Sequence, residues 1–214
     1  MNRKKNRFLL PCLLLGAFVL WTAAVRLVDV RAIGPRNSTV GFAALNRLVH
    51  GWTGVNRGLY DLTDRLGLVP MGVCVVFGLL GLFQWVRRRS LRRVDADLLL
   101  LGGFYVAVAA CFVLFELFPV NYRPVLIGGR LEASYPSSTT LLVMCVMPTA
   151  RMQLHRRIPN RALDRAAGIA VWGFTAFMVV GRILSGVHWI TDILGGALLS
   201  AGLVTLYGTL SEKA

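Results

Sequence analysis

Long stretches without a charged residue recur along this chain, and they constrain its fold more than any other feature. Most approach the ~20 residues that a helix needs to cross a bilayer. The runs are continuous rather than alternating, which is typical of membrane helices and not of barrel strands. We therefore predict an all-α polytopic membrane protein, a single domain over residues 1–214 with six transmembrane helices. The six stretches are 8–25, 67–86, 98–115, 133–150, 166–181 and 193–210.

The fourth and fifth stretches are the weakest of the six. Pro136 and Pro148 shorten the helical part of the fourth. The fifth is short, but its flanking arginines can extend their charged ends to the membrane interface. We keep both as predicted spans.

The net charge of +14 raises the question of nucleic acid binding. The distribution of the basic residues argues against that partner, because they gather before the first span and in every second connection between spans. Cytoplasmic loops collect such charge. We predict both termini in the cytoplasm of a cell-membrane protein, with contact to anionic lipid headgroups as a second use of the charge. The clusters are Arg3, Lys4, Lys5 and Arg7; Arg87, Arg88, Arg89, Arg92 and Arg93; Arg151, Arg156, Arg157, Arg161 and Arg165; and Lys213.

The first apolar stretch also resembles a signal peptide. No small-x-small cleavage pattern follows it closely, so we favour an uncleaved anchor.

The four cysteines, at 12, 74, 111 and 145, fall inside apolar stretches without a CxxC pair. We expect buried free thiols rather than disulfides or a metal site.

Three segments then lie outside the cell. In the first, residues 29–66, apolar residues recur at three- and four-residue steps, which predicts an amphipathic helix loosened by Gly51, Gly54 and Gly58. A helix lying flat on the outer leaflet is the simpler interpretation. A lid or side wall for a lipid site is the functional alternative.

The third outside segment contains Arg182, His188 and Asp192. If the last helix begins near Ser185 or Gly186, His188 and Asp192 share one helix face, one turn apart. A charge at the bilayer centre costs ~2.5–3.5 kcal/mol, so Asp192 needs a partner, and the histidine is available. Such a pair fixes the imidazole tautomer, and an arginine beside it favours an anionic substrate such as phosphate. A purely structural His–Asp hydrogen bond explains these three residues equally well.

The second outside segment favours the functional interpretation. Ser137, Ser138, Thr139 and Thr140 follow Pro136 at an expected helix start, where free N–H groups and the helix dipole attract anions. Plain N-capping is the alternative. Arg123, just upstream, adds a second guanidinium. Together these groups predict a phosphoryl-transfer site with histidine as the nucleophile.

These residues resemble the type 2 phosphatidic acid phosphatase family, the lipid phosphatases related to vanadium haloperoxidases. That family carries K-x6-R-P, then P-S-G-H, then S-R-x5-H-x3-D. Here "GRILSGVHWITD" matches the third motif except that Gly181 replaces serine. The first motif keeps Arg123 and Pro124, with Glu116 in place of lysine. The second reads "PSST", with Thr139 in place of histidine.

The resemblance implies roles for the matching positions. His188 is the expected nucleophile and Asp192 its orienting residue. Arg123 and Arg182 are expected to hold phosphate oxygens, with Ser137, Ser138 and Thr139 also at the substrate. The family uses the second-motif histidine to protonate the leaving oxygen, and Thr139 is too weak an acid for that. Losing a general acid costs ~10²–10⁴ in rate.

Three explanations remain open. In the one that we favour, the substrate is a lipid diphosphate of the polyprenyl (undecaprenyl) type, whose phosphate leaving group needs no acid. Alternatively, another residue such as His50 supplies the proton. Finally, the protein binds lipid phosphate without catalysis. A transporter is a separate class, disfavoured because we find no internal repeat and the polar cluster sits at one membrane edge.

The prediction is a membrane lipid phosphatase that acts on a lipid phosphate or diphosphate through a phosphohistidine at the outer face. No metal or cofactor is expected, because no cluster of carboxylates or histidines is present to hold one. The sequence leaves the lipid and the oligomeric state undetermined.

Overall fold

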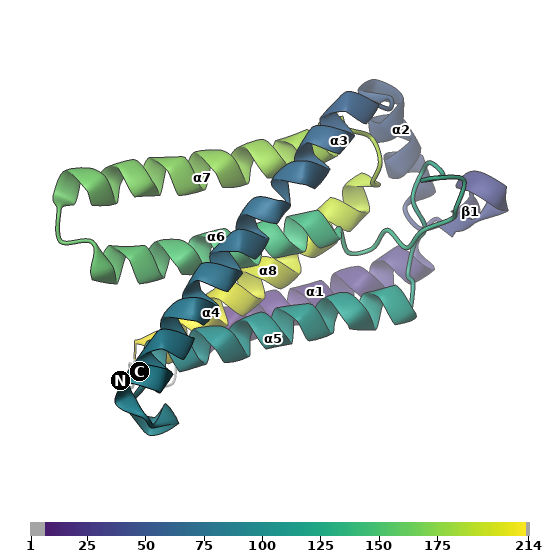
Figure 1. Cartoon of the computed structure of the whole chain (residues 1–214). Coiled ribbons are helices and arrows are strands. Elements are labelled where there is room, and N and C mark those ends of the chain that lie inside the picture. The colour runs from purple at the N-terminus through teal and green to yellow at the C-terminus, as the bar shows by residue number, and fades with distance from the viewer. Residues whose placement is uncertain (1–6, 213–214) are drawn as a thin grey trace.

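The computed structural model describes residues 7–212 as a bundle of long helices. Six of the helices within these residues are long, and two shorter ones, α2 and α3, lie at one end of the bundle (Figure 1). The long helices are α1 (Leu9–Leu27), α4 (Leu68–Arg88), α5 (Ala96–Leu117), α6 (Ser138–Arg157), α7 (Arg161–Leu184) and α8 (Ile190–Ser211).

Within the described residues, five helical segments are long and apolar enough to cross a membrane. They include α1, α5, α7 and α8, and a fifth segment that joins α3 and α4 over Arg57–Arg88. The helix α6 does not qualify, because its sequence carries polar and basic residues. It starts at Ser138, where the sequence placed a helix start after Pro136, and not at residue 133, where the charge-free stretch begins. The prediction of a membrane protein built of helices agrees with these findings, whereas the count of six spans stays a prediction.

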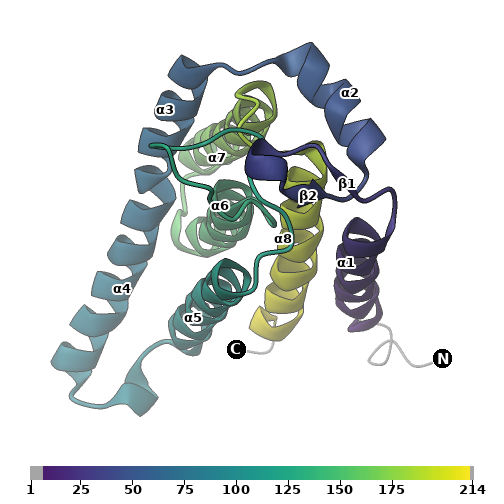
Figure 2. The same ribbon diagram turned by 90° about the vertical axis from the view of Figure 1, so that its right-hand side faces the viewer.

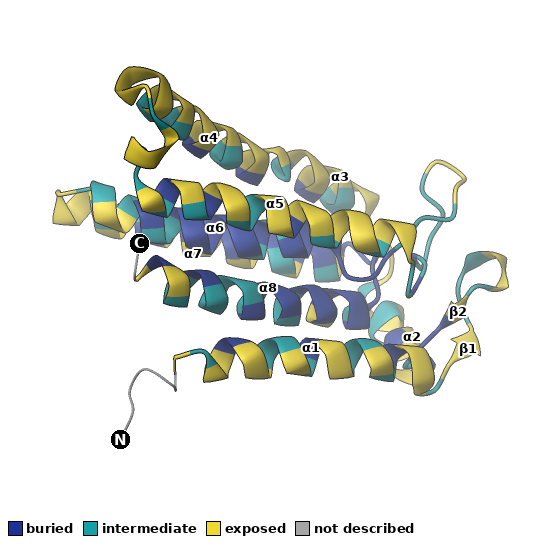
Figure 3. Ribbon diagram, turned by 90° about the horizontal axis from the view of Figure 1, so that it is seen from below, coloured by how far each residue is buried: buried dark blue, intermediate teal, exposed yellow. Residues whose placement is uncertain are grey.

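The helix α6 occupies the interior of the bundle. It packs against α7 and α8 and also contacts α4 and α5. Figure 3 shows buried residues concentrated on α6 and α8, while exposed residues cover the outer faces of α1, α4 and α5. Many of these exposed residues are large and apolar, including Leu20, Val76 and Val106. Such a surface is suited to contact with lipid chains. The more polar helix α6 is enclosed by the other helices and does not need to face lipid.

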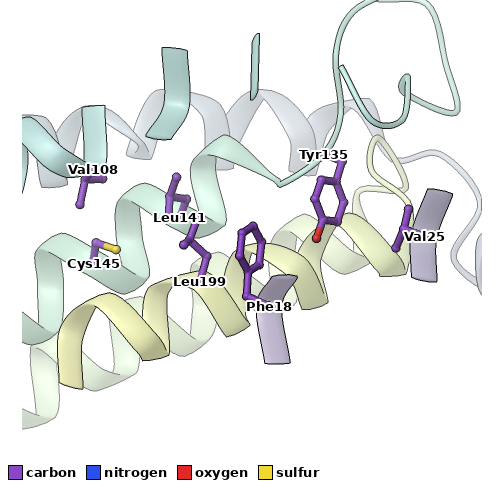
Figure 4. Packing of buried hydrophobic residues seen from close by; sticks show 7 residues of the cluster. All are labelled: Phe18, Val25, Val108, Tyr135, Leu141, Cys145 and Leu199. Carbon is purple, nitrogen blue, oxygen red and sulfur yellow. The ribbon is translucent and has the colours of Figure 1, made fainter. Parts of the chain in front are cut away.

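Tyr135 connects the core to the loop that precedes α6. Figure 4 shows its ring between Phe18 and Val25, in a cluster that continues through Leu199 and Leu141. The Tyr135 hydroxyl is 2.7 Å from Thr22 Oγ1 on α1. A Cβ added at Gly195 would lie 2.5 Å from the Tyr135 ring, so glycine permits α8 to approach this side chain. The loop before α6 is therefore anchored on both α1 and α8.

The predicted amphipathic segment, residues 29–66, differs from a single helix. It contains a short antiparallel pair, β1 (Arg31–Ala32) with β2 (Thr39–Val40), and the turn η1 (Pro35–Asn37) between them. Two helices follow, α2 (Ala43–Thr53) and α3 (Arg57–Leu66). Gly54 separates them with φ of 59°, a left-handed conformation that favours glycine. In Figures 1 and 2, α3 continues nearly along the line of α4 rather than lying across the bundle.

The two helices α2 and α3 meet the loop between α7 and α8. The Asn56 N–H donates to the Ser185 carbonyl oxygen at 3.0 Å. Gly186, with φ of 64°, lies so close to Gly54 that a Cβ there would be 1.7 Å from the Gly54 carbonyl oxygen. Asn46 of α2 donates to Thr191 Oγ1 at 3.0 Å. The segment therefore packs against the α7–α8 loop and the start of α8, and its use as a side wall for a lipid site stays a prediction.

The basic connections lie at the end of the bundle away from these loops. Figure 1 places the α6–α7 turn and the turn η2 (Leu91–Arg93) at the end opposite α2 and β1. Of the predicted terminal basic group, only Arg7 belongs to the described residues; residues 1–6 and Lys213 lie outside them. This clustering agrees with the positive-inside pattern.

The cysteines are free, as predicted, but only Cys145 is buried. Cys12 lies on the exposed face of α1, and Cys74 and Cys111 are half-buried. The prediction of four buried thiols is therefore wrong for three of them: Cys12 lies on the outer surface, Cys74 lines a cavity next to α5, and Cys111 packs at the edge of a core cluster.

Gly186→Ala is expected to destabilise the fold. Alanine would be strained at a φ of 64° and would collide with the Gly54 backbone. Such strain costs about 1–3 kcal/mol. The matched control is Gly173→Ala in α7, where a Cβ meets nothing within 4 Å. Thermal unfolding of the detergent-solubilised protein should show a lower Tm for Gly186→Ala than for wild type and an unchanged or higher Tm for Gly173→Ala. Equal Tm values for the two variants would contradict the predicted backbone contact.

Candidate active site

His188 lies in the loop between α7 and α8, at the end of the bundle where α2 and α3 pack. The sequence predicted that it shares a helix with Asp192, but α8 begins only at Ile190. Gly186 turns the chain with a positive φ, and Asp192 caps the helix by accepting the Trp189 N–H at 3.0 Å. His188 is thereby placed before the helix, with only 4% of its surface exposed.

Two arginines converge on one edge of the His188 ring. Arg123 Nη1 is 3.2 Å from His188 Nε2, and Arg182 Nη2 is 3.5 Å from the same atom. Arg182 is in the last turn of α7, and Arg123 is in the loop after α5. Both arginines are buried. The two guanidinium groups concentrate positive charge beside a ring nitrogen, which is an arrangement suited to an anion.

The protonation state of His188 follows from these neighbours. Burial, and then the charges of Arg123 and Arg182, lower the pKa of His188 well below its ordinary value. The ring is therefore neutral near pH 7. Guanidinium groups only donate hydrogen bonds, so Nε2 carries the lone pair. A neutral imidazole with Nε2 unprotonated is a competent nucleophile.

Arg182 is held in place by α3, which belongs to the segment 29–66 that the sequence offered as a lid or side wall. Its guanidinium lies over the Tyr60 ring, 5.0 Å from the ring centroid, and Nη1 is 3.3 Å from Thr63 Oγ1. Arg182 Nε is buried without a hydrogen-bond partner among the described residues. A buried charged donor without a partner is costly, and a bound anion would satisfy it.

Asp192 is fully buried and accepts three hydrogen bonds. Besides Trp189, Ser134 Oγ donates to its Oδ2 at 2.5 Å and Asn121 Nδ2 donates to its Oδ1 at 3.2 Å. Its nearest oxygen is 4.0 Å from His188 Nδ1. The predicted direct contact between carboxylate and imidazole is thus replaced by a contact through Ser134, whose Oγ is 3.0 Å from Nδ1. Neither Ser134 nor Asn121 was predicted from the sequence, because neither belongs to a motif or to a regular spacing of residues.

The start of α6 supplies the remaining predicted site residues. Ser137 is the N-cap residue, and its N–H donates to the Asp192 carbonyl oxygen at 3.0 Å, which fixes α6 against α8. Its hydroxyl accepts from Thr140 at 3.1 Å. Ser138, the first residue of α6, lines the same cavity as Arg123 and His188. Its position places the unpaired N–H groups of the first helical turn near that cavity.

The cavity beside His188 has a volume of about 260 Å³. Two carboxylates, Glu116 and Glu132, share its wall with Arg123, Ser134 and Ser138. A Glu132 carboxylate oxygen is 3.2 Å from Arg123 Nε. The cavity therefore combines the positive charge of Arg123 beside His188 with negative charge from these two glutamates.

A larger and mainly apolar cavity of about 570 Å³ lies between α4, α5 and α6. Phe112, Ser138 and Leu141 line both cavities, so the two adjoin. Thr139 lines the larger cavity and not the one beside His188.

His50 faces a separate small hollow. It shares that hollow with His188, but the remaining lining residues, such as Val49 and Ile193, are mostly apolar. Its ring packs 5.4 Å from that of Trp189, and burial lowers the pKa of His50. Because Arg123 and Ser138 are absent from this hollow, His50 is poorly placed to protonate a leaving group held by Arg123.

The comparisons with known proteins agree with this geometry. The chain is 31% identical over 81 residues to phosphatidylglycerophosphatase B of Bacillus subtilis (strain 168). The aligned residues cover 37% of this chain and 40% of that protein. It is similar in fold to the crystal structure of the first transmembrane PAP2 type phosphatidylglycerolphosphate phosphatase from Bacillus subtilis. That match has a TM-score of 0.67 and 18% identity, and it covers 95% of this chain and 96% of that one.

The sequence model of the PAP2 superfamily matches residues 103–213, just over half of the chain. The matched range includes Arg123, the start of α6, Arg182, His188 and Asp192. This chain therefore belongs to the PAP2 superfamily.

Proposed function

We propose that the protein is a membrane lipid phosphatase that uses His188 as its nucleophile. The observation that carries this proposal is the neutral, buried imidazole whose Nε2 faces two guanidinium groups at the edge of a cavity. A phosphate group in that cavity would be bound by Arg123 and Arg182, and by the N–H groups at the start of α6.

The reaction has two steps. His188 Nε2 attacks phosphorus, a P–N bond forms, and the P–O bond to the lipid breaks with its electron pair on the leaving oxygen. Water then attacks phosphorus and releases inorganic phosphate from the histidine. The two arginines stabilise the negative charge of both transition states.

The adjoining apolar cavity supports a lipid substrate. Its lining comes from α4, α5 and α6, and it meets the smaller cavity at Phe112, Ser138 and Leu141. An alkyl or prenyl chain in the larger cavity would leave its phosphate near His188.

The leaving group decides between two substrate classes. The first is a polyprenyl-type diphosphate, whose leaving phosphate needs no general acid; this suits Thr139 at the second motif. The second is a lipid phosphomonoester such as the substrate named for the phosphatidylglycerophosphatase relatives. Glu116 and Glu132 favour this second class, because carboxylates accept hydrogen bonds from a hydroxylated leaving group and repel an additional phosphate.

The orientation in the membrane completes the proposal. The basic connections at one end of the bundle favour cytoplasmic termini, and His188 at the other end would then face outward in a cell membrane.

His188→Ala is expected to abolish phosphate release from lipid phosphates, by at least the ~10³-fold that loss of a nucleophile typically costs. The purified wild-type protein should also form an acid-labile, base-stable phosphoprotein that the variant lacks. His50→Gln is the matched histidine control and should keep near wild-type turnover. A wild-type protein that binds lipid phosphate but releases none would instead favour the non-catalytic lipid-binding function.

The two substrate classes are separated by a panel of lipids assayed with Glu116→Gln and Glu132→Gln. If the diphosphate is the substrate, these variants should turn it over at the wild-type rate or faster, since a repulsive charge is removed. If the monoester is the substrate, they should lose about 5- to 100-fold in kcat/KM, because a charged hydrogen-bond acceptor at the leaving group is replaced by a neutral, weaker one. Colorimetric phosphate release measures both. Diphosphate hydrolysis that falls in both glutamate variants would contradict the charge argument.

Ala109→Trp in α5 is expected to raise the KM for long-chain lipid phosphate at least fivefold by filling the apolar cavity. Turnover of a short-chain, water-soluble phosphate ester should stay unchanged. Ala110→Trp is the matched control, because Ala110 is also exposed on α5 but does not line the cavity. Equal effects of the two tryptophans on the long-chain lipid would argue that the chain does not occupy this cavity.

A further inference from the structure

Ser134 lies between Asp192 and His188 and separates the two groups that the sequence placed in direct contact. Its Oγ is 2.5 Å from Asp192 Oδ2 and 3.0 Å from His188 Nδ1, whereas Oδ2 and Nδ1 are 4.0 Å apart. All three residues are buried, with Ser134 only 2% exposed. The Asp192 carboxylate therefore interacts with the His188 ring through the Ser134 hydroxyl.

The chemistry of Asp192, Ser134 and His188 determines which group donates and which accepts in each of the hydrogen bonds that join them. Asp192 accepts from Ser134, from the Asn121 amide and from the Trp189 N–H, as an ionised carboxylate does. The single hydroxyl proton of Ser134 therefore points to Asp192, and the Ser134 oxygen is free to accept from His188 Nδ1. At the opposite edge of the ring, the arginines can only donate to Nε2. Both edges thus require the same tautomer, with the proton on Nδ1.

The backbone around Ser134 holds its hydroxyl at this point. The Ser134 N–H donates to the Asn121 carbonyl oxygen at 2.9 Å, and the Ser134 carbonyl oxygen is 3.2 Å from His188 Nδ1. The same Asn121 contacts Asp192 through its side chain. The next residue, Tyr135, is anchored between α1 and α8. Serine here is thus fixed by its neighbours on both sides.

We propose that Ser134 is a positioning residue that transmits the orienting effect of Asp192 to His188. This inference rests on the proposed function, because it concerns how the nucleophile is prepared. When Nε2 forms its bond to phosphorus, positive charge develops on the ring while the Nδ1 proton stays in place. The chain Nδ1–H···Oγ–H···Oδ2 then offsets that charge without any proton being lost. Ser134 does not bind phosphate in this scheme, so its contribution falls on kcat rather than on KM.

A double-mutant cycle tests the transmission. Ser134→Ala is expected to lower kcat about 10- to 100-fold, with the KM for the lipid changed less than threefold, since Arg123 and Arg182 remain. Asp192→Asn should lower kcat at least as much. If Asp192 acts through Ser134, the double variant should be no slower than Asp192→Asn alone. A double variant whose loss equals the product of the two single losses would overturn the proposal, as would an unchanged kcat in Ser134→Ala.

Ser200→Ala is the control for the loss of a buried hydroxyl. Ser200 is fully buried in α8, and its hydroxyl bonds the Leu141 carbonyl oxygen rather than a site residue. It should keep near wild-type kcat. A kcat loss in Ser200→Ala as large as that in Ser134→Ala would show that the loss in Ser134→Ala comes from altered packing. It would refute the positioning role of Ser134.

A second measurement does not depend on turnover. The chain has three histidines, so ¹⁵N-histidine labelling with His188→Ala as reference identifies the His188 ring signals. The Nδ1 resonance should shift in both Ser134→Ala and Asp192→Asn and stay fixed in Ser200→Ala. An unmoved resonance in Ser134→Ala would overturn the proposal. A wild-type protein that releases no phosphate but shows these shifts would refute the proposed function while supporting the hydrogen-bond chain.

Discussion

The site depends on the hydrogen bonds that the buried carboxylate of Asp192 accepts. An ionised group inside an apolar bundle is stable only when its hydrogen-bonding capacity is filled. Asp192 meets this requirement with Asn121 and Ser134 from the loop before α6 and with the Trp189 N–H at the start of α8. One carboxylate thereby joins two segments that are far apart in the sequence, and the same contacts place Ser134 against His188.

The second support of the site comes from outside the residues matched by the superfamily. Tyr60 and Thr63 of α3 hold the Arg182 guanidinium, and Asn56 bonds the loop that carries His188. The close approach of Gly54 and Gly186 makes this packing possible. The segment for which the sequence predicted a surface helix is thus part of the wall that holds Arg182 beside His188. Its contacts position Arg182, and none of its described charged residues lines the cavity beside His188.

Sequence reasoning located the main parts of the site correctly in one respect: Arg123, Arg182, His188 and the start of α6 do lie together. Their residue types carry the signal, since arginine, histidine and aspartate are expensive inside an apolar chain and seldom occur there without a partner. The predicted contact between His188 and Asp192 was wrong in detail. It assumed a helix that begins near Gly186, whereas positive φ at that glycine delays the helix to Ile190. Thr139, which was expected at the substrate together with Ser137 and Ser138, lines the adjoining apolar cavity and not the one beside His188.

The sequence by itself determined the helical membrane architecture, because long charge-free runs leave the backbone no other way to satisfy its hydrogen bonds in lipid. It also determined which end of the bundle collects basic residues. The tertiary structure alone decided that α6 is enclosed, that Ser134 separates Asp192 from His188, and that two cavities adjoin at Ser138. These features arise from contacts between segments tens of residues apart. No local pattern encodes such contacts, because they depend on how neighbouring helices and loops fill space around one another.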